Sequence, residues 1–395
     1  MTALLFTGQN AAAFFSCSSK TKSFRPAAGF LHLSTSLRLP LKRPREIGWI
    51  SSIKRLISSS PYPSEDPALD PLLKAMDENK KNLTVDEALQ QSLQYLQSRN
   101  IPEAQISTTN IISKILDLDW SSGYRDLQRI LDTSNTKSSN PLALTELTPK
   151  QVESLRDMLL RRANHEPLQY ILGQWDFLDY TLEIQAPLLC PRPETEELVD
   201  MVAMACQKKY PNDLSSTVNI LDIGCGTGAI GIALADMLPN AHITAIDIDP
   251  IAIEVSNRNA KKILGSSGAA GRYQAILSSI DDFQPMQPFH VIVSNPPYIP
   301  ERDAIALEKT VVEYESHDAL FSGEDGLDVI RSIVKRLPDL GAADCWMEVD
   351  PSHPELIQRL LEKDGDMEYH ETRKDMFGLD RFVHIRMHRR RPLDA

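Results

Sequence analysis

Hydrophobic positions recur with helical spacing from about residue 67 to residue 163. Leucines lie three or four residues apart just after Thr84 and Glu87, a pair with the spacing of a capping box. Two further apolar stripes predict helices that begin near Pro102 and Pro149. The pattern therefore predicts a small helical bundle in this part of the chain.

The period changes after residue 163. Residues 166–190 alternate as strands do, with Gly173 as a turn residue, and predict a β-hairpin that links two domains. From residue 218 onward, apolar runs alternate with helical segments, which predicts an α/β fold with a parallel, doubly wound sheet. The last predicted strand can pair with a strand at 366–371 as an antiparallel edge hairpin. The strands are expected at 218–223, 242–248, 272–277, 290–294, 343–349 and 380–387.

The first sixty residues have a different composition from the rest. They hold nine of the 42 basic residues, one of the 54 acidic residues and eleven serines. A basic, serine-rich and acid-poor N-terminus is typical of an organellar transit peptide. A secretory signal is disfavoured because no single apolar core precedes a small-residue cleavage site. The alternative is an ordinary disordered tail.

Without this segment the chain keeps 33 basic and 53 acidic residues, a net charge of −20. Such an acidic protein is poorly suited to non-specific binding of nucleic acid, which needs a basic face. No apolar run reaches the length of about 18 residues that a membrane span requires. The five cysteines lie far apart, so neither a disulfide framework nor a structural zinc site is expected.

A glycine-rich turn follows the apolar run 219–223 and precedes a helical segment. Gly224, Gly226 and Gly228 are expected to let the backbone approach a ligand where a Cβ would clash. Asp247 ends the next strand, nineteen residues after Gly228, where an acid can accept hydrogen bonds from ribose hydroxyls. The combination predicts a nucleoside site. S-adenosylmethionine is favoured over a nicotinamide cofactor because the spacing is GxGxG and not GxGxxG.

The tetrapeptide Asn295-Pro296-Pro297-Tyr298 follows another apolar strand directly. The prolines fix φ and remove two donors, which leaves a rigid set of carbonyl acceptors beside an aromatic ring. The carboxyl ends of parallel strands are where ligands bind in such folds. The set fits a planar –NH₂ group that donates to the Asn295 side chain and the Pro296 carbonyl. The alternative is a proline-rich turn that merely leaves the strand.

These features resemble class I S-adenosylmethionine-dependent methyltransferases, in which Asn-Pro-Pro-Tyr occurs in enzymes that methylate planar amide or exocyclic amino nitrogens. Over about residues 67–388 the sequence is similar to the HemK/PrmC family. The segments that carry this similarity are 161–173, 188–196, 313–320 and 323–327. Those enzymes methylate the side-chain amide nitrogen of glutamine in the Gly-Gly-Gln motif of class 1 peptide-chain release factors.

The composition of the first sixty residues and the resemblance together imply a domain order. A transit peptide over 1–60 is followed by a helical substrate-docking domain over 61–163 and a hairpin linker over 164–192. A Rossmann-like methyltransferase domain then covers 193–388, with a tail at 389–395. The release factor would be the protein partner, and neither membrane contact nor direct nucleic-acid binding is expected.

The resemblance also implies roles for single residues. Asn295, Pro296 and Tyr298 are the expected catalytic residues, and with Pro297 they form the substrate site. The adenine contact is left open between Ile280 and Asp281. Arg192 and Glu196 either help to close the cofactor pocket or domain junction, or form an ordinary salt-bridged linker. The residues expected to bind S-adenosylmethionine are Asp222, Gly224, Cys225, Gly226, Thr227, Gly228, Asp247, Ile280, Asp281 and Asn295.

An amide nitrogen is a poor nucleophile, so the expected catalysis rests on orientation of the nitrogen toward the sulfonium methyl group. This chemistry calls for neither a metal nor a covalent enzyme intermediate. An adenine-N6 methyltransferase on DNA or RNA would share the Asn-Pro-Pro-Tyr chemistry, and a non-catalytic cofactor-binding factor is a third alternative. If the resemblance to the family holds, the substrate is an organellar release factor, with the chloroplast favoured over the mitochondrion.

Overall fold

The structure is a computed structural model that describes residues 83–118, 123–132, 140–210, 217–306, 313–362 and 366–388. The predicted transit peptide and C-terminal tail lie outside these ranges. Packing divides the described residues into two compact units, the first with those in 83–108 and 126–152, the second with those in 109–125 and 153–388. The domain boundaries expected at residues 163 and 192 stay predictions.

The helices expected before residue 163 are present. The side chain of Thr84 accepts a hydrogen bond from the Glu87 N–H at 3.3 Å, and the Glu87 carboxylate accepts one from the Thr84 N–H at 3.0 Å, which confirms the capping box. Thr148 and Gln151 cap a later helix in the same way. The elements are α3 (Val85–Ser98), α4 (Ala104–Ile115), α5 (Gly123–Asp132), the 3₁₀ helix η2 (Pro141–Leu144) and α6 (Pro149–Ala163).

The hairpin is shorter than expected, and the prediction of strand over residues 166–173 was wrong. This stretch forms the helix α7 (Leu168–Leu172), and Gly173, at φ 69°, ends that helix instead of turning the hairpin. Four of the five α7 residues are buried, so the helix shows no polar face that could reveal its period. The hairpin pairs β1 (Gln174–Phe177) with β2 (Tyr180–Glu183).

A seven-stranded sheet forms the centre of the second unit, in the order β5-β4-β3-β6-β7-β9-β8. The first five of these strands run parallel, and β9 pairs antiparallel with both β7 and β8, which confirms the edge hairpin. Every strand predicted after residue 217 is present to within three residues at its ends. They are β3 (Val218–Ile223), β4 (Ala241–Asp247), β5 (Tyr273–Leu277), β6 (Val291–Ser294), β7 (Asp344–Glu348), β8 (Met367–Lys374) and β9 (Asp380–Met387).

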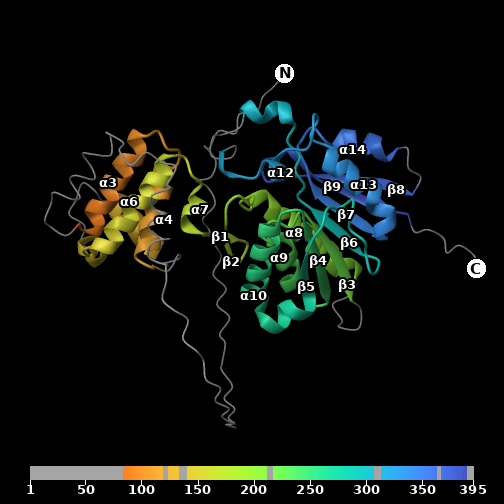
Figure 1. Ribbon diagram of the computed structural model, residues 1–395, viewed down its shortest axis with the longest axis horizontal. Helices are drawn as coiled ribbons and strands as arrows, with labels where there is room; N and C mark the ends of the chain where they lie inside the picture. The colour runs from red at the N-terminus through yellow and green to blue at the C-terminus, as the bar shows by residue number, and fades with distance from the viewer. Residues whose placement is uncertain are drawn as a thin grey trace, which may run out of the picture. The chain divides into compact units, whose positions relative to one another are not determined.

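Helices cover both faces of this sheet (Figure 1). Successive residues of β3 alternate between two cores, as a strand buried on both faces requires. One core packs α8 (Pro193–Lys209), α9 (Ala229–Met237) and α10 (Pro250–Arg272) against the sheet, and the other packs α13 (Asp328–Leu340) and α14 (Pro354–Leu361). The architecture is thus the predicted Rossmann-like fold, with its strand ends held rigidly from both sides.

Candidate active site

Strand register brings the predicted site residues to one edge of the sheet. Ile223 pairs with Ile246 on one side and with Ser294 on the other, and Ser294 pairs with Met347. The residues that follow these pairs therefore start side by side at the carboxyl ends of four parallel strands. They are Gly224, Asp247, Asn295 and Glu348. Ligands bind at this edge in open α/β sheets.

The three loop glycines have positive φ, at 71°, 52° and 83°, a region that side chains with a Cβ rarely adopt. A Cβ added at Gly224 or Gly226 would meet nothing within 4 Å, so these two positions face open space. At Gly228 a Cβ would lie 2.7 Å from Ile232 Cδ1 and 2.9 Å from Ser256 Cβ. The expected reason for a glycine at 228 is corrected: it prevents a clash with the protein itself rather than with a ligand.

Asp247 joins the loop to the end of β4. Its Oδ2 accepts a hydrogen bond from the Gly226 N–H at 2.8 Å, and its Oδ1 accepts one from the Asp249 N–H at 2.9 Å. Burial raises the pKa of this carboxyl, and the backbone donors that bind it act in the opposite direction. The residue is only half-buried, so its carboxylate can also meet a ligand that lies over the loop.

Asp222 lies beneath the loop and is fully buried. Its Oδ2 accepts a hydrogen bond from the Gly231 N–H at 3.0 Å, while its Oδ1 has no partner within the described part of the chain. Burial raises the pKa of this carboxyl to about 7. In this structure Asp222 anchors the start of α9. Any effect of Asp222 on a cofactor would therefore be indirect, through the glycine loop that it supports.

Cys225 and Thr227 are also buried in the loop. The Thr227 carbonyl accepts a hydrogen bond from Asn259 Nδ2 at 3.0 Å, so the loop backbone is fixed from α10. Burial raises the pKa of the Cys225 thiol well above its ordinary value, which keeps the sulfur protonated and a weak nucleophile. Both side chains pack inward, and only their backbone can face a ligand.

Neither residue considered for the adenine contact presents an apolar side chain to solvent. Ile280 is buried in the core beneath α13, and Asp281 is exposed, with its Oδ2 accepting from Ser332 Oγ at 3.1 Å. Sequence reasoning missed two other side chains, Ile248 just after β4 and Leu277 at the end of β5, which are 57% and 56% exposed. The sequence signal for this surface was the apolar residue directly after Asp247, because an adenine base can pack against apolar side chains.

Asn295 is held by a chain of hydrogen bonds. Its Nδ2 donates to Thr195 Oγ1 at 3.1 Å, and the Thr195 hydroxyl donates to Glu348 Oε2 at 2.8 Å. The Tyr298 hydroxyl donates to the other carboxylate oxygen, Oε1, at 3.4 Å. Sequence reasoning assigned no role to Thr195 or Glu348. The one sequence signal for Glu348 was an acidic residue placed between the apolar residues Met347 and Val349.

The segment after β6 packs closely against its surroundings. Pro296 is buried, and Pro297 and Tyr298 are half-buried. A Cβ on Gly326 would lie 2.3 Å from the Tyr298 carbonyl oxygen, so only glycine lets the two backbones approach this closely. Gly326 belongs to the segment 323–327, whose similarity to the HemK/PrmC family thus has a packing reason.

Arg192 and Glu196 do not pair with each other. The Arg192 guanidinium donates to both carboxylate oxygens of Glu315, at 2.9 and 3.0 Å. Glu196 Oε1 accepts a hydrogen bond from the Leu178 N–H in the turn of the hairpin, at 2.9 Å. The two residues therefore tie the start of α8 to two different segments, which favours a structural role.

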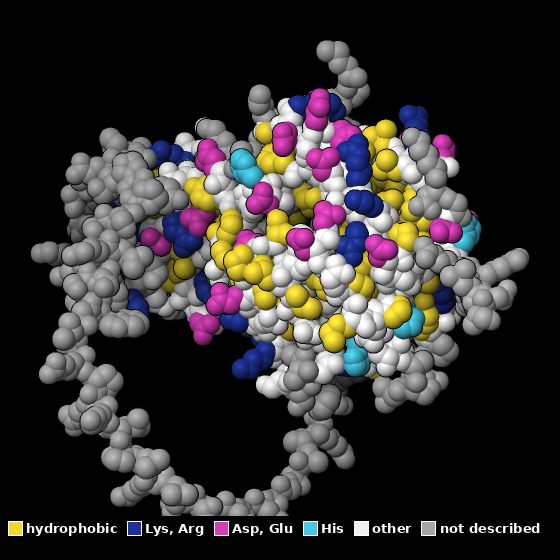
Figure 2. Space-filling view, turned by 45° about the vertical axis from the view of Figure 1, so that its right-hand side comes forward, with side chains coloured by type: hydrophobic (Ala, Val, Ile, Leu, Met, Phe, Trp, Pro, Cys, Tyr) yellow, Lys and Arg dark blue, Asp and Glu magenta, His cyan; other side chains and the backbone are white. Residues whose placement is uncertain are grey.

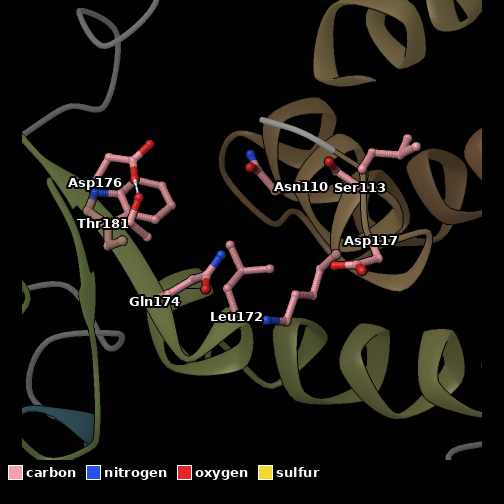
Figure 3. Close-up of a pocket in the computed structure, with 10 residues that line it drawn as sticks. Asn110, Ser113, Asp117, Leu172, Gln174, Asp176 and Thr181 are labelled. Carbon is pink, nitrogen blue, oxygen red and sulfur yellow. Dashed lines mark hydrogen bonds between the residues drawn. The ribbon is translucent and has the colours of Figure 1, made fainter. Parts of the chain in front are cut away.

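A cavity of about 180 Å³ lies elsewhere in the second unit. Figure 3 shows its mostly polar lining, in which Asp176 Oδ1 accepts a hydrogen bond from the Thr181 hydroxyl at 2.7 Å. None of the predicted site residues contributes to it. The cavity therefore adds nothing to the cofactor or acceptor site.

One group of metal-type ligands among the described residues lies on the edge strands, outside this site. It consists of His370, Glu371 and His384. The Glu371 carboxylate accepts two hydrogen bonds from the Arg373 guanidinium, at 3.0 and 2.8 Å. An arginine already neutralises the carboxylate, and we assign no metal to the group.

The described cysteines, Cys190, Cys206, Cys225 and Cys345, are all unbridged. No helix within the described ranges is both long and apolar enough to cross a bilayer. On the face that Figure 2 shows, Lys and Arg side chains lie interspersed with Asp and Glu side chains. This face does not present the continuous basic surface that nucleic-acid binding needs.

Comparisons with known proteins identify the family of this chain. The PrmC N-terminal domain profile matches residues 142–173, and the methyltransferase small domain profile matches residues 199–323. The human MTRF1L release factor glutamine methyltransferase is 34% identical over 297 residues, which cover 73% of this chain and 83% of the relative. The release factor glutamine methyltransferase of Geobacter sulfurreducens is 32% identical, over 78% of this chain and 98% of the relative. The chain therefore belongs to the HemK/PrmC family of S-adenosylmethionine-dependent release factor glutamine methyltransferases.

Proposed function

We propose that this protein methylates the side-chain amide nitrogen of the glutamine in the Gly-Gly-Gln motif of an organellar class 1 release factor. The observation that supports this most is the orientation of Asn295. Its Nδ2 is bound to Thr195, so its Oδ1 is the end of the amide that can accept a hydrogen bond from a substrate –NH₂ group. A planar primary amide has the donors that this acceptor needs.

The strand edge fits S-adenosylmethionine. Gly224 and Gly226 border open space, the Asp247 carboxylate is half-exposed, and Ile248 and Leu277 offer apolar surface. These residues would hold the methionine, ribose and adenine portions, in that order. When bound, the cofactor supplies an electrophilic methyl group on a sulfonium sulfur.

The protein's own part in the reaction is to orient the acceptor. Asn295 Oδ1 and the Pro296 carbonyl would accept the two hydrogens of the glutamine –NH₂ group, which aims the nitrogen lone pair along one line. The same two oxygens stabilise positive charge that develops on the nitrogen as the new N–C bond forms. The surplus proton then leaves to water, and Tyr298 shapes the pocket around the amide.

The organelle is proposed from residues 1–60, whose composition is that of a transit peptide. Their serine content favours a chloroplast over a mitochondrion. Import of the radiolabelled full chain into isolated chloroplasts and mitochondria tests this directly. Protection from protease in only one organelle identifies the destination, and protection in neither contradicts the proposal.

Mass spectrometry of a purified organellar class 1 release factor, incubated with the protein and S-adenosylmethionine, tests the activity. We expect a gain of one methyl group, localised to the glutamine of Gly-Gly-Gln. Label that enters DNA or RNA adenine instead would support an adenine-N6 methyltransferase. Cofactor binding without transfer to either acceptor would support a binding factor.

A further inference from the structure

The hydrogen-bond chain behind Asn295 has a fixed direction. A carboxylate can only accept hydrogen bonds, so the Thr195 hydroxyl must donate its single proton to Glu348, at 2.8 Å. The Thr195 oxygen can then only accept, and it accepts from Asn295 Nδ2 at 3.1 Å. The Asn295 amide is thereby prevented from turning over, because its carbonyl end would face the lone pairs of the Thr195 oxygen.

Glu348 depends on these hydroxyls because no cation pairs with it. Within the described residues it forms no ion pair, and its side chain is 1% exposed. Arg381, the basic residue facing it from β9, donates to Asp375 at 3.2 Å and to the Val349 carbonyl. Arg192 is bound to Glu315. The side-chain hydrogen bonds to Glu348 thus come from hydroxyl groups, and Arg381 stabilises its charge only from a distance. Burial of such a carboxylate is costly, which suggests that it has a function.

We propose that Thr195 and Glu348 are positioning residues, which hold the Asn295 side chain so that its Oδ1 faces the amide of the substrate. This inference rests on the proposed function for the identity of that amide. Thr195 and Glu348 touch neither the acceptor nor the cofactor in this scheme. Thr195 acts through Asn295, and Glu348 acts through Thr195 and through the Tyr298 hydroxyl that it accepts from.

The direction of the hydrogen bonds from Glu348 to Asn295 depends on whether the Glu348 carboxyl carries a proton. Burial raises the pKa of Glu348 to about 7, and Glu194 on α8 adds to the rise, while Thr195, Arg381 and Tyr298 oppose it. Once protonated, the Glu348 carboxyl must donate its own hydrogen, and it can do so to the Thr195 oxygen. The Thr195 hydroxyl then donates to the Asn295 carbonyl, which turns the amide over. Turnover should therefore fall as the pH drops below about 7.

Kinetics of variants test the proposal on a release factor substrate. We expect Thr195→Val to lower kcat about tenfold, the effect of one lost hydrogen bond, and Thr195→Ser to restore it to within about twofold. Glu348→Gln should remove the acidic limb from the pH profile of kcat, and the KM for S-adenosylmethionine should stay unchanged. Glu355→Gln, at an exposed position of α14, is the matched control. An unchanged acidic limb in Glu348→Gln would overturn the proposal, as would equal losses in the valine and serine variants.

A second measurement needs no substrate. In the ¹⁵N-labelled full chain, the Asn295 side-chain NH₂ signals, identified by their loss in Asn295→Asp, should titrate with a midpoint near pH 7. That titration should vanish in Glu348→Gln and in Thr195→Val. Signals that ignore both substitutions would refute the positioning role, whatever the acceptor is. A normal titration with no methylation of Gly-Gly-Gln would refute the proposed substrate alone.

Discussion

At the scale of single residues, two buried carboxyl groups set the chemistry of this strand edge. Asp222 and Glu348 both have pKa values raised to about 7, and burial is the largest cause for each. One supports the glycine loop and the other supports Asn295. The folded state disfavours the charged form of both carboxyl groups, and the stability of the protein therefore depends on pH.

The substitution Asp222→Asn should raise the stability of the protein more at high pH than at low pH. The pKa of Asp222 is higher in the folded state than in the unfolded chain, where it is about 4. Its contribution to stability is therefore full below about pH 4 and is lost as the pH rises through about 7. The melting temperature of the variant, relative to the wild type, should increase from pH 5 to pH 8. Asp318→Asn, at an exposed position, is the control substitution.

The substitution Asn295→Ala should lower turnover far more than it lowers cofactor affinity. The side chain orients the acceptor nitrogen, and a lost orienting or charge-stabilising group costs about 100-fold or more in rate. The Kd for S-adenosylmethionine, measured by calorimetry, should change less than about threefold. Asn257→Ala on α10, where Nδ2 donates to the Ile253 carbonyl, serves as the control. Turnover equal to that of the wild type would remove Asn295 from the mechanism.

At the scale of elements, the glycines in the loop between β3 and α9 serve two different purposes: Gly228 avoids a clash within the protein, and Gly226 leaves space for a ligand. Gly228→Ala should destabilise the protein by about 3 kcal/mol, because its Cβ would lie 2.9 Å from Ser256 Cβ at a φ of 83°. Gly226→Ala should cost only about 1 kcal/mol, since nothing lies within 4 Å of the new Cβ. It should instead weaken S-adenosylmethionine binding. Urea unfolding and calorimetry separate the two effects, and equal unfolding midpoints would contradict the packing role of Gly228.

The sequence could predict elements whose burial leaves a regular pattern. The parallel strands of the sheet were predictable because each is a largely apolar run between turn residues. Asp247 ends one of these runs, and Asn295 directly follows another. The helix α7 was not predictable, because a five-residue helix that is buried on most sides shows neither the helical nor the strand period of hydrophobic residues. The contact of Thr195 with Glu348 joins residues 153 positions apart, and it depends on where α8 begins against β7. Only the folded chain supplies that juxtaposition.

At the scale of the whole molecule, the chain combines a basic N-terminal segment with a strongly acidic remainder. A variant that starts at residue 61 should keep the kcat and KM of the full chain, since the site lies wholly within later residues. It should also fail to enter isolated organelles. Methylation assays and import assays on the same preparation check both outcomes. Loss of activity on truncation would show that the segment does more than direct the protein.

The start of α8 places constraints on chain length. Arg192, Thr195, Glu196 and Glu197 bind four separate segments, through Glu315, Asn295, the Leu178 N–H and the Met376 N–H. Each residue added to a helix rotates the remainder of that helix by about 100°. A single insertion or deletion between 192 and 197 would thus turn several of these groups away from their partners at once. Natural variants that keep the activity should accept substitutions here far more readily than any change in length.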